Sequence, residues 1–149
     1  AQGLPVATPL MTDAADLDTL AAYYGDMRQT LGMPLLIMGH GHPANGNPAY
    51  LRLRARLPEG VYLGCLSGEP GLAQVMTELR RQPERALTVT PLLMSVGGHT
   101  LNDMAGDAPD SWRSQLTRAG FDVHCRHTGV GRTAVVQQIF VRKLRALLG

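Results

Sequence analysis

Two histidines in this sequence stand beside glycine pairs at the ends of apolar runs. His40 lies between Gly39 and Gly41, and His99 follows Gly97 and Gly98. Small neighbours leave an imidazole accessible, and an accessible imidazole can serve as a metal ligand or a general base. Two imidazoles without thiolates suit Co²⁺, Ni²⁺, Fe²⁺ or Zn²⁺, but they are too few for a tight structural site. The pair therefore predicts a site that holds a divalent ion briefly.

Further polar residues follow the apolar runs. Glu69, in the segment 67–70, can act as a metal ligand or a proton acceptor, although a carboxylate at a helix start more commonly complements the helix dipole. Asn102 and Asp103 can orient His99, although capping the segment that follows them is the more common role.

The segment 127–132 is rich in glycine and precedes a helical pattern. A turn of this kind can bind an anion at the helix N-terminus, but Gly129 and Gly131 match only part of a dinucleotide-binding fingerprint. Arg132 closes the segment and carries a planar guanidinium that suits carboxylates.

Apolar runs bounded by glycine and proline alternate with helical patterns along the chain. Such runs are typical of strands buried on both faces, and their alternation with helices predicts a parallel sheet. We expect strands at 35–38, 61–66, 86–94 and 121–125, and helices at 13–29, 48–57, 70–82, 110–118 and 133–148. The last helix carries one apolar stripe, formed by Val136, Ile139, Phe140, Val141, Leu144 and Leu147. The expected fold is a flavodoxin-like three-layer α/β sandwich with about four parallel strands and the site at their carboxyl ends.

Length and composition set outer limits on the function. With 149 residues, 44% of them hydrophobic, the chain suits a single domain, 1–149, with a packed core. A formal charge of +2 is too balanced to indicate nucleic-acid binding.

No apolar run of about 18 residues occurs, so we expect no membrane span. The missing signal-peptide pattern favours the cytoplasm, or the periplasm if a signal peptide was removed before Ala1. Cys65 and Cys125 are expected to be small buried residues.

Several of these motifs together resemble a known family. Pro9-Leu10, Gly39-His40-Gly41 and the residues 42–45 are similar to the anaerobic cobalt chelatases of the CbiK type. The resemblance continues through the segments 64–70, 91–105, 110–112, 120 and 129–131, and extends from about Gly3 to the end of the chain. Its most specific part is the segment around His99, with Asn102-Asp103-Met104.

The resemblance implies a class II chelatase, a lyase that inserts Co²⁺, with Fe²⁺ and Ni²⁺ as alternatives, into the tetrapyrrole sirohydrochlorin during cobalamin biosynthesis. It implies that His40 and His99 bind the metal and accept the pyrrole protons, and that no organic cofactor is needed. Arginines around the cleft would hold the carboxylates of the substrate. Arg132, together with Glu69, is assigned to substrate binding on this basis.

The resemblance also implies that this chain corresponds to the C-terminal half of a two-half chelatase. A second copy or a separate N-terminal half would then complete the cleft. Two positions depart from the family pattern: Ser67 stands where the family tends to have Glu, and Arg132 stands where it often has an acidic residue. These departures leave two other hypotheses open, a non-catalytic metal- or tetrapyrrole-binding module and an anion binder that uses the turn at 129–131.

Overall fold

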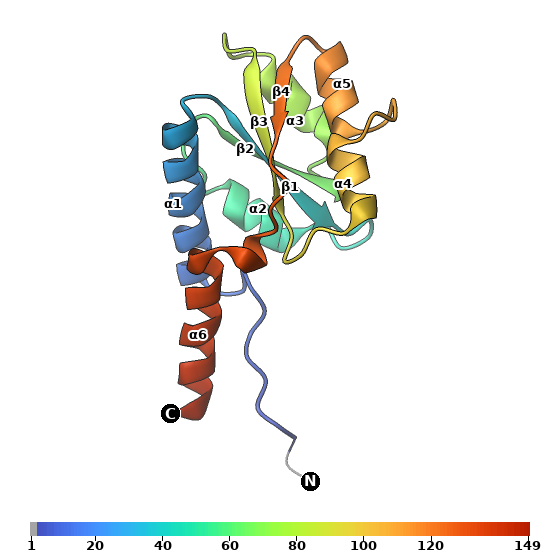
Figure 1. Cartoon of the computed structure of the whole chain (residues 1–149). Coiled ribbons are helices and arrows are strands. Elements are labelled where there is room, and N and C mark those ends of the chain that lie inside the picture. The colour runs from blue at the N-terminus through green and yellow to red at the C-terminus, as the bar shows by residue number, and fades with distance from the viewer. Residues whose placement is uncertain (1–2) are drawn as a thin grey trace.

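Four parallel strands form the central sheet of the chain (Figure 1). The computed structural model describes residues 3–149, and of His99 it describes only the backbone. The strands lie in the order β2-β1-β3-β4, and each neighbouring pair is parallel. Their bounds are Leu35–Gly41 for β1, Val61–Ser67 for β2, Ala86–Leu92 for β3 and Asp122–Cys125 for β4. The predicted fold class is confirmed.

Helices cover both faces of this sheet (Figure 1). One face is covered by α1 (Ala14–Leu31), α2 (Pro48–Arg54) and the first turns of α6 (Ala134–Leu148), which a short 3-10 helix, Val130–Arg132, precedes. The other face is covered by α3 (Leu72–Leu79), α4 (Gly98–Ala105) and α5 (Trp112–Arg118). None of the helices within residues 3–149 has the length and apolarity needed to cross a bilayer.

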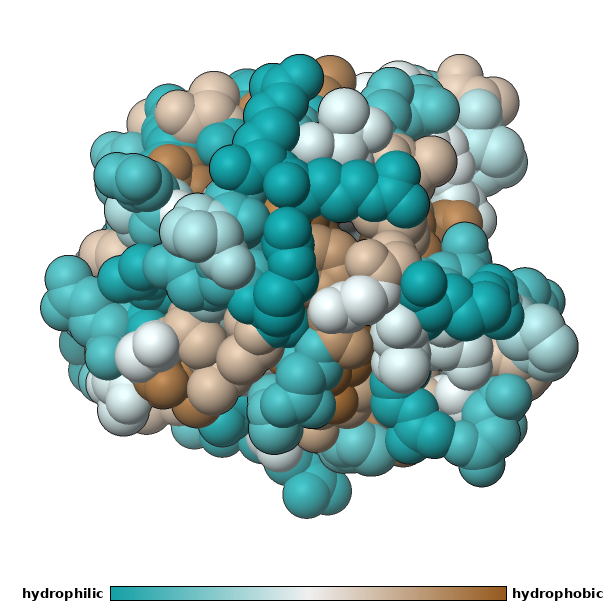
Figure 2. Space-filling view, turned by 90° about the horizontal axis from the view of Figure 1, so that it is seen from above, coloured by the Kyte–Doolittle hydropathy of each residue, from teal (hydrophilic) through white to brown (hydrophobic). Residues whose placement is uncertain are grey.

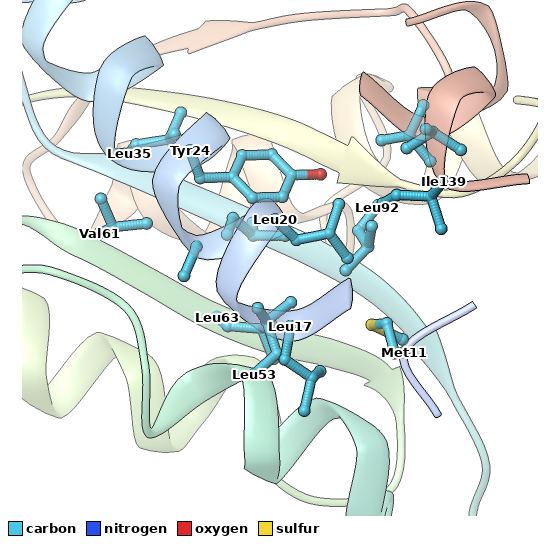
Figure 3. Packing of buried hydrophobic residues seen from close by; sticks show 14 of the residues in the cluster. Met11, Leu17, Leu20, Tyr24, Leu35, Leu53, Val61, Leu63, Leu92 and Ile139 are labelled. Atoms are coloured by element: carbon cyan, nitrogen blue, oxygen red, sulfur yellow. The ribbon is translucent and has the colours of Figure 1, made fainter. Parts of the chain in front are cut away.

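Each face of the sheet has its own hydrophobic core. On the first face, Leu17 and Leu20 of α1 are at most 1% exposed and pack with Leu35 of β1 (Figure 3). Leu36, the next residue of β1, belongs to the core on the second face. Because successive side chains of a strand point to opposite faces, an unbroken apolar run is what a doubly covered strand requires.

Pro91 lies within β3 and limits the length of the ladder between β3 and the edge strand β4. The Thr88 N–H donates to the Pro34 oxygen on the β1 side, so the backbone of position 91 faces β4. Proline has no N–H to donate, and the ladder between β3 and β4 ends at the pair Val89 and Cys125. The chain after Cys125 therefore leaves the sheet and contributes loops to its carboxyl-end rim.

The sequence pattern predicts no helix between the strand at 86–94 and the helix at 110–118. This prediction is wrong, because α4 begins at Gly98. Gly97 has an extended backbone at the N-cap, and its oxygen accepts the N–H of Leu101 at 3.0 Å. Met104 is fully buried in the second core, and this packing stabilises the short helix. Glycine disfavours a helix by about 1 kcal/mol relative to alanine. The glycines at the start of α4 therefore make this helix difficult to predict from helix propensities.

The apolar stripe predicted for α6 is buried only in its first turns. Val136 and Ile139 are at most 2% exposed, whereas Phe140, Val141 and Leu144 are 37%, 46% and 53% exposed. Figure 1 shows the reason, because α6 runs past the edge of the sheet and away from the body of the molecule. An apolar helix face is left uncovered there.

The opposite end of the molecule, where the strands begin, is mostly hydrophilic (Figure 2). Small hydrophobic areas interrupt this surface. A cavity of about 420 Å³ at this end is lined by residues of both charges, including Arg28, Glu59, Arg81 and Glu84. The predicted site residues lie at the other end of the sheet.

Candidate active site

The strand order reverses between β1 and β3. From β1 the chain passes to β2 on one side and then to β3 on the other. In open parallel sheets, ligands bind outside the carboxyl ends of the strands at such a point. His40 is the penultimate residue of β1, and His99 lies in the first turn of α4, the helix that follows β3. The topology therefore brings the two segments that carry the predicted histidines to one edge of the sheet.

The side chain of His40 is exposed at this edge. Its Nδ1 lies 3.1 Å from the carbonyl oxygen of Gly41. A carbonyl oxygen can only accept, so this hydrogen bond places the ring proton on Nδ1 and leaves the lone pair on Nε2. A Cβ on Gly39 would lie 2.3 Å from Cε1 of Tyr50, so the backbone before His40 packs directly on that ring. His40 thus has a fixed backbone and one nitrogen suited to bind a metal ion or accept a proton.

His42 lies in the same motif but has a different environment. Its Nδ1 accepts the N–H of Ala44 at 3.1 Å, and its own backbone N–H donates to Oδ1 of Asn47 at 2.7 Å. The accepting nitrogen of His42 is therefore used within the loop. This contrast distinguishes His40 as the candidate ligand of the motif.

His40 lines a cavity of about 460 Å³ beside the carboxyl end of β2. Thr100 and Asp103 of α4 and Trp112 of α5 also line it. Burial raises the pKa of the Cys65 thiol, another lining residue, to about 11. At neutral pH this cysteine is therefore a thiol and does not offer the thiolate that metal ions prefer. The imidazole of His40 is left as the nitrogen donor of this cavity.

His99 directly precedes Thr100, which lines this cavity. The side chain of His99 lies outside the described part of the structure, so a shared ion between the two imidazoles stays a prediction. Among the side chains that are described, no three His, Cys, Asp or Glu residues gather in a way that could hold a metal ion.

The sequence that forms this domain matches a family model described as "Cobalt chelatase (CbiK)" over residues 4–148. The chain belongs to the CbiK family. The resemblance noted in the motifs around His40 and His99 is thereby confirmed.

Two curated relatives share this family's sequence pattern. The chain is 32% identical over 121 residues to the sirohydrochlorin cobaltochelatase CbiKC of Nitratidesulfovibrio vulgaris (strain Hildenborough), covering 77% of this chain and 43% of the relative. It is 27% identical over 154 residues to the sirohydrochlorin cobaltochelatase of Salmonella typhimurium (strain LT2), covering 97% of this chain and 57% of the relative. The chain thus spans about half the length of these two proteins.

A solved structure shares the fold. It is the crystal structure of a protein from Marinobacter aquaeolei VT8 that is named as a CbiX protein of cobalamin (vitamin B12) biosynthesis. The two structures superpose with a TM-score of 0.58 at 16% sequence identity, covering 78% of this chain and 97% of the other. At this identity the likeness supports the α/β architecture alone.

In this CbiK-family chain, the Glu69 carboxylate lies at the start of the segment that leads into α3. Its Oε2 accepts the backbone N–H of Gly71 at 3.0 Å. Gly68 and Gly71, on either side of Glu69, line the cavity that contains His40. Glu69 is thus at the border of the cavity, in the helix-start position that is common for a carboxylate. Whether Glu69 also contacts a substrate stays a prediction.

Arg132 lies at a second cavity, of about 450 Å³, between the ends of β3 and β4. His127 and Ser95 also line this cavity. In the turn before Arg132, the N–H groups of Val130 and Gly131 donate to the oxygens of Leu93 and Met94, at 2.8 and 3.1 Å. Because these donors are occupied, the anion-binding hypothesis for the turn loses its main support. The guanidinium of Arg132 remains exposed at the rim.

The local sequence did not single out Asn47, which connects the segments beside the cavity of His40. It is 3% exposed, and its side-chain amide makes hydrogen bonds to the loops after both β1 and β2. The signal available in the sequence was an asparagine directly before Pro48, a typical start for a helix. Nothing in the local sequence indicates that its amide reaches a second strand.

Proposed function

We propose that this chain contributes the metal-binding wall of an enzyme that inserts a divalent metal ion, Co²⁺, into sirohydrochlorin in cobalamin biosynthesis. The observation that carries this proposal is the His40 imidazole, which offers Nε2 at the switch point of the sheet. Membership of a family described as cobalt chelatases supports it, as do two relatives named sirohydrochlorin cobaltochelatases.

In this proposal, His40 and His99 take the ion from solution and present it to the ring. Two imidazole nitrogens leave coordination positions to which pyrrole nitrogens can bind. Two protons leave the pyrrole nitrogens as the divalent ion enters, so the charge balances. A neutral imidazole is a suitable acceptor for these protons. In this proposal no electrons are transferred and no organic cofactor takes part.

We assign substrate contacts to two residues at the rim. Arg132 can pair with a carboxylate of sirohydrochlorin, because a guanidinium binds a carboxylate through two parallel hydrogen bonds. Glu69 borders the cavity of His40, where its carboxylate can accept a proton from the substrate. The metal itself is assigned as Co²⁺ over Fe²⁺ and Ni²⁺, and competition between these ions in the insertion reaction tests this choice.

We also propose that residues 1–149 form a single domain that supplies one half of the cleft. A flat macrocycle held for metal insertion needs a wall on each side, and the His40 edge of this domain supplies one of them. The exposed apolar residues of α6, Phe140, Val141 and Leu144, offer a surface on which a second copy or a separate N-terminal half can pack.

The absorption spectrum of sirohydrochlorin separates insertion from binding. With Co²⁺ present and both walls of the cleft in place, the proposal predicts that the metallated ring accumulates to a concentration well above that of the protein. A ring that binds in proportion to the protein and stays unmetallated would contradict the proposal. That outcome would favour the non-catalytic binding module that Ser67 and Arg132 leave open.

A further inference from the structure

The side chain of Asn47 joins two loops that border the cavity of His40. Its Oδ1 accepts the backbone N–H of His42 at 2.7 Å. Its Nδ2 donates to the oxygen of Ser67 at 3.0 Å and to the oxygen of Glu69 at 2.8 Å. One buried amide therefore bridges the loop after β1 and the loop after β2, with both kinds of its polar atom in use.

Two glycines allow the loops to approach this amide closely. Gly41 has φ +74°, and a Cβ there would lie 2.1 Å from the Ser67 oxygen. Gly68 has φ +73°, and a Cβ there would lie 2.3 Å from the His42 oxygen. The same added atoms would come within 3.1 and 2.9 Å of Nδ2 of Asn47. Both positions thus require glycine for their backbone conformation and for the space around the amide.

The Asn47 amide adds hydrogen bonds beyond the last residue pair of the ladder between β1 and β2. Gly41 and Ser67 are the final pair between β1 and β2. The ladder ends at this pair, and the Asn47 side chain supplies hydrogen bonds that connect the two segments beyond it. Asn47 itself has φ +49°, a left-handed conformation that asparagine adopts more readily than most residues, and its N–H donates to Oδ1 of Asn45 at 2.9 Å. The backbone therefore holds the bridge in place.

We infer that Asn47 is a positioning residue for metal binding by His40, an inference that rests on the proposed function. Nδ1 of His40 donates to the oxygen of Gly41, and the amide of Asn47 holds the next residue, His42. Loss of the bridge frees the peptide that fixes the proton on Nδ1 and the direction of Nε2. Loss of a group that hydrogen-bonds directly to a metal-binding imidazole usually changes metal affinity about 10- to 100-fold, and because Asn47 acts through such a group we expect the lower end of this range.

Two substitutions separate the parts of this bridge. Asn47→Gly removes the side chain and keeps the left-handed backbone without strain. Asn47→Asp keeps an oxygen for the His42 N–H but removes the donors to Ser67 and Glu69. The matched control is Asn45→Ala, which removes one hydrogen bond inside the loop and leaves the bridge between the strands intact.

The full chain is titrated with Co²⁺ alone, and the amide exchange of His42 is followed by NMR. We expect both Asn47 variants to bind Co²⁺ about tenfold more weakly, and the control to stay within about twofold of the unsubstituted chain. The His42 amide should exchange at least about tenfold faster in Asn47→Gly than in the control, because its acceptor is removed. In the insertion reaction, KM for Co²⁺ should rise while KM for sirohydrochlorin stays unchanged.

Unchanged Co²⁺ affinity in Asn47→Gly would overturn the inference, even if the protein were less stable. Unchanged exchange of the His42 amide would overturn it as well, because the bridge would then not hold the loop. A protein with both walls of the cleft in place that binds Co²⁺ but inserts none would contradict the proposed function, and the Co²⁺ titration and the His42 amide exchange would still decide the role of Asn47. An unsubstituted chain that binds no Co²⁺ would overturn both proposals.

Discussion

The phenol group of Tyr24 is completely buried between α1 and the sheet (Figure 3). Within residues 3–149, its hydroxyl has no hydrogen-bond partner. Burial, reinforced by the neighbouring tyrosines Tyr23 and Tyr50, raises the pKa of Tyr24 far above its ordinary value of 10.0. This residue contributes packing, and its hydroxyl lowers the stability of the fold.

Replacing Tyr24 with phenylalanine tests this account. Tyr24→Phe should raise the free energy of unfolding by about 1 kcal/mol at pH 7, because it removes a buried hydroxyl that lacks a partner. Urea denaturation measures the change, and the half-buried neighbour provides a control, since Tyr23→Phe should stay within about 0.5 kcal/mol. A clear loss of stability in Tyr24→Phe would mean that the hydroxyl is bonded in solution.

The effect of Tyr24→Phe on stability should also depend on pH. In the unfolded chain Tyr24 ionises at about pH 10, whereas in the folded chain it keeps its proton at this pH. The folded state then binds more protons, so stability falls as the pH rises above about 10. This contribution should be missing in Tyr24→Phe, and a parallel decline in both proteins would contradict it.

The chemistry of single residues was only partly readable from the sequence. His40 and His99 could be chosen because their glycine neighbours and their place after apolar runs are local features. The proton position on His40 and the bridge made by Asn47 depend on contacts that fold and register create, such as the bond from Nδ2 to Ser67. Local sequence does not contain these contacts.

Among the elements, α6 is attached to the domain by a group of charges as well as by its apolar residues. Nζ of Lys143, which is 6% exposed, lies 2.8 Å from Asp16 and 2.7 Å from Asp13 at the start of α1. Arg142 also pairs with Asp16, which is fully buried. The only lysine of the chain thus joins the last helix to the first.

Removing the charge of Lys143 should destabilise the protein strongly. Lys143→Met leaves the buried carboxylate of Asp16 with Arg142 as its remaining cation, and breaking a buried pair costs about 3 kcal/mol or more. The matched control on the same helix is the exposed Arg145, whose replacement by methionine should change stability by less than about 0.5 kcal/mol. Equal unfolding midpoints for the two variants would contradict this role.

The difference between the unsubstituted chain and Lys143→Met should depend on pH. Burial alone lowers the pKa of Lys143, but the hydrogen bonds that its ammonium group donates to Asp13 and Asp16, and the negative charges of these carboxylates, outweigh the effect of burial and bring the pKa above the ordinary 10.5. Its stabilising effect is present below pH 10.5 and is lost as the pH rises through the raised pKa. The hydrogen bond from Lys143 lowers the pKa of Asp13 below 3.8, so that contribution is present above pH 3.8 and is lost as the pH falls. The difference should be largest between about pH 5 and 9.

Elements with apolar periodicity were predicted well, and those without it were not. β1 and α1 follow unbroken or regularly spaced apolar residues, which directly reflect burial. The glycine-rich start of α4 has no such signal, and its helix depends on the burial of Met104. For α6 the stripe was read correctly, but how far the sheet extends beneath it is a property of the assembled fold.

At the scale of the whole molecule, the uncovered face of α6 is the feature that bears on assembly. Phe140, Val141 and Leu144 are exposed where α6 leaves the sheet (Figure 1). If a second copy completes the cleft, light scattering should give twice the mass of one chain. Leu144→Glu should return the protein to a single chain, because a charge cannot be buried in an apolar contact. A strict monomer at working concentration would exclude a cleft built from two copies, and another source of the second wall would then be required.

We propose that the edge of the sheet that carries His40 and His99 performs metal insertion. The most direct measurement is the rate of Co²⁺ insertion into sirohydrochlorin by the unsubstituted protein, His40→Ala and His99→Ala. The control is His124→Ala, because His124 is exposed on β4 and lines neither of the two cavities at the carboxyl ends of the strands. We predict that both His40→Ala and His99→Ala lose insertion, at least about 100-fold, because each removes a metal ligand and a proton acceptor. His124→Ala should retain metal insertion. Full activity in either His40→Ala or His99→Ala would contradict the account.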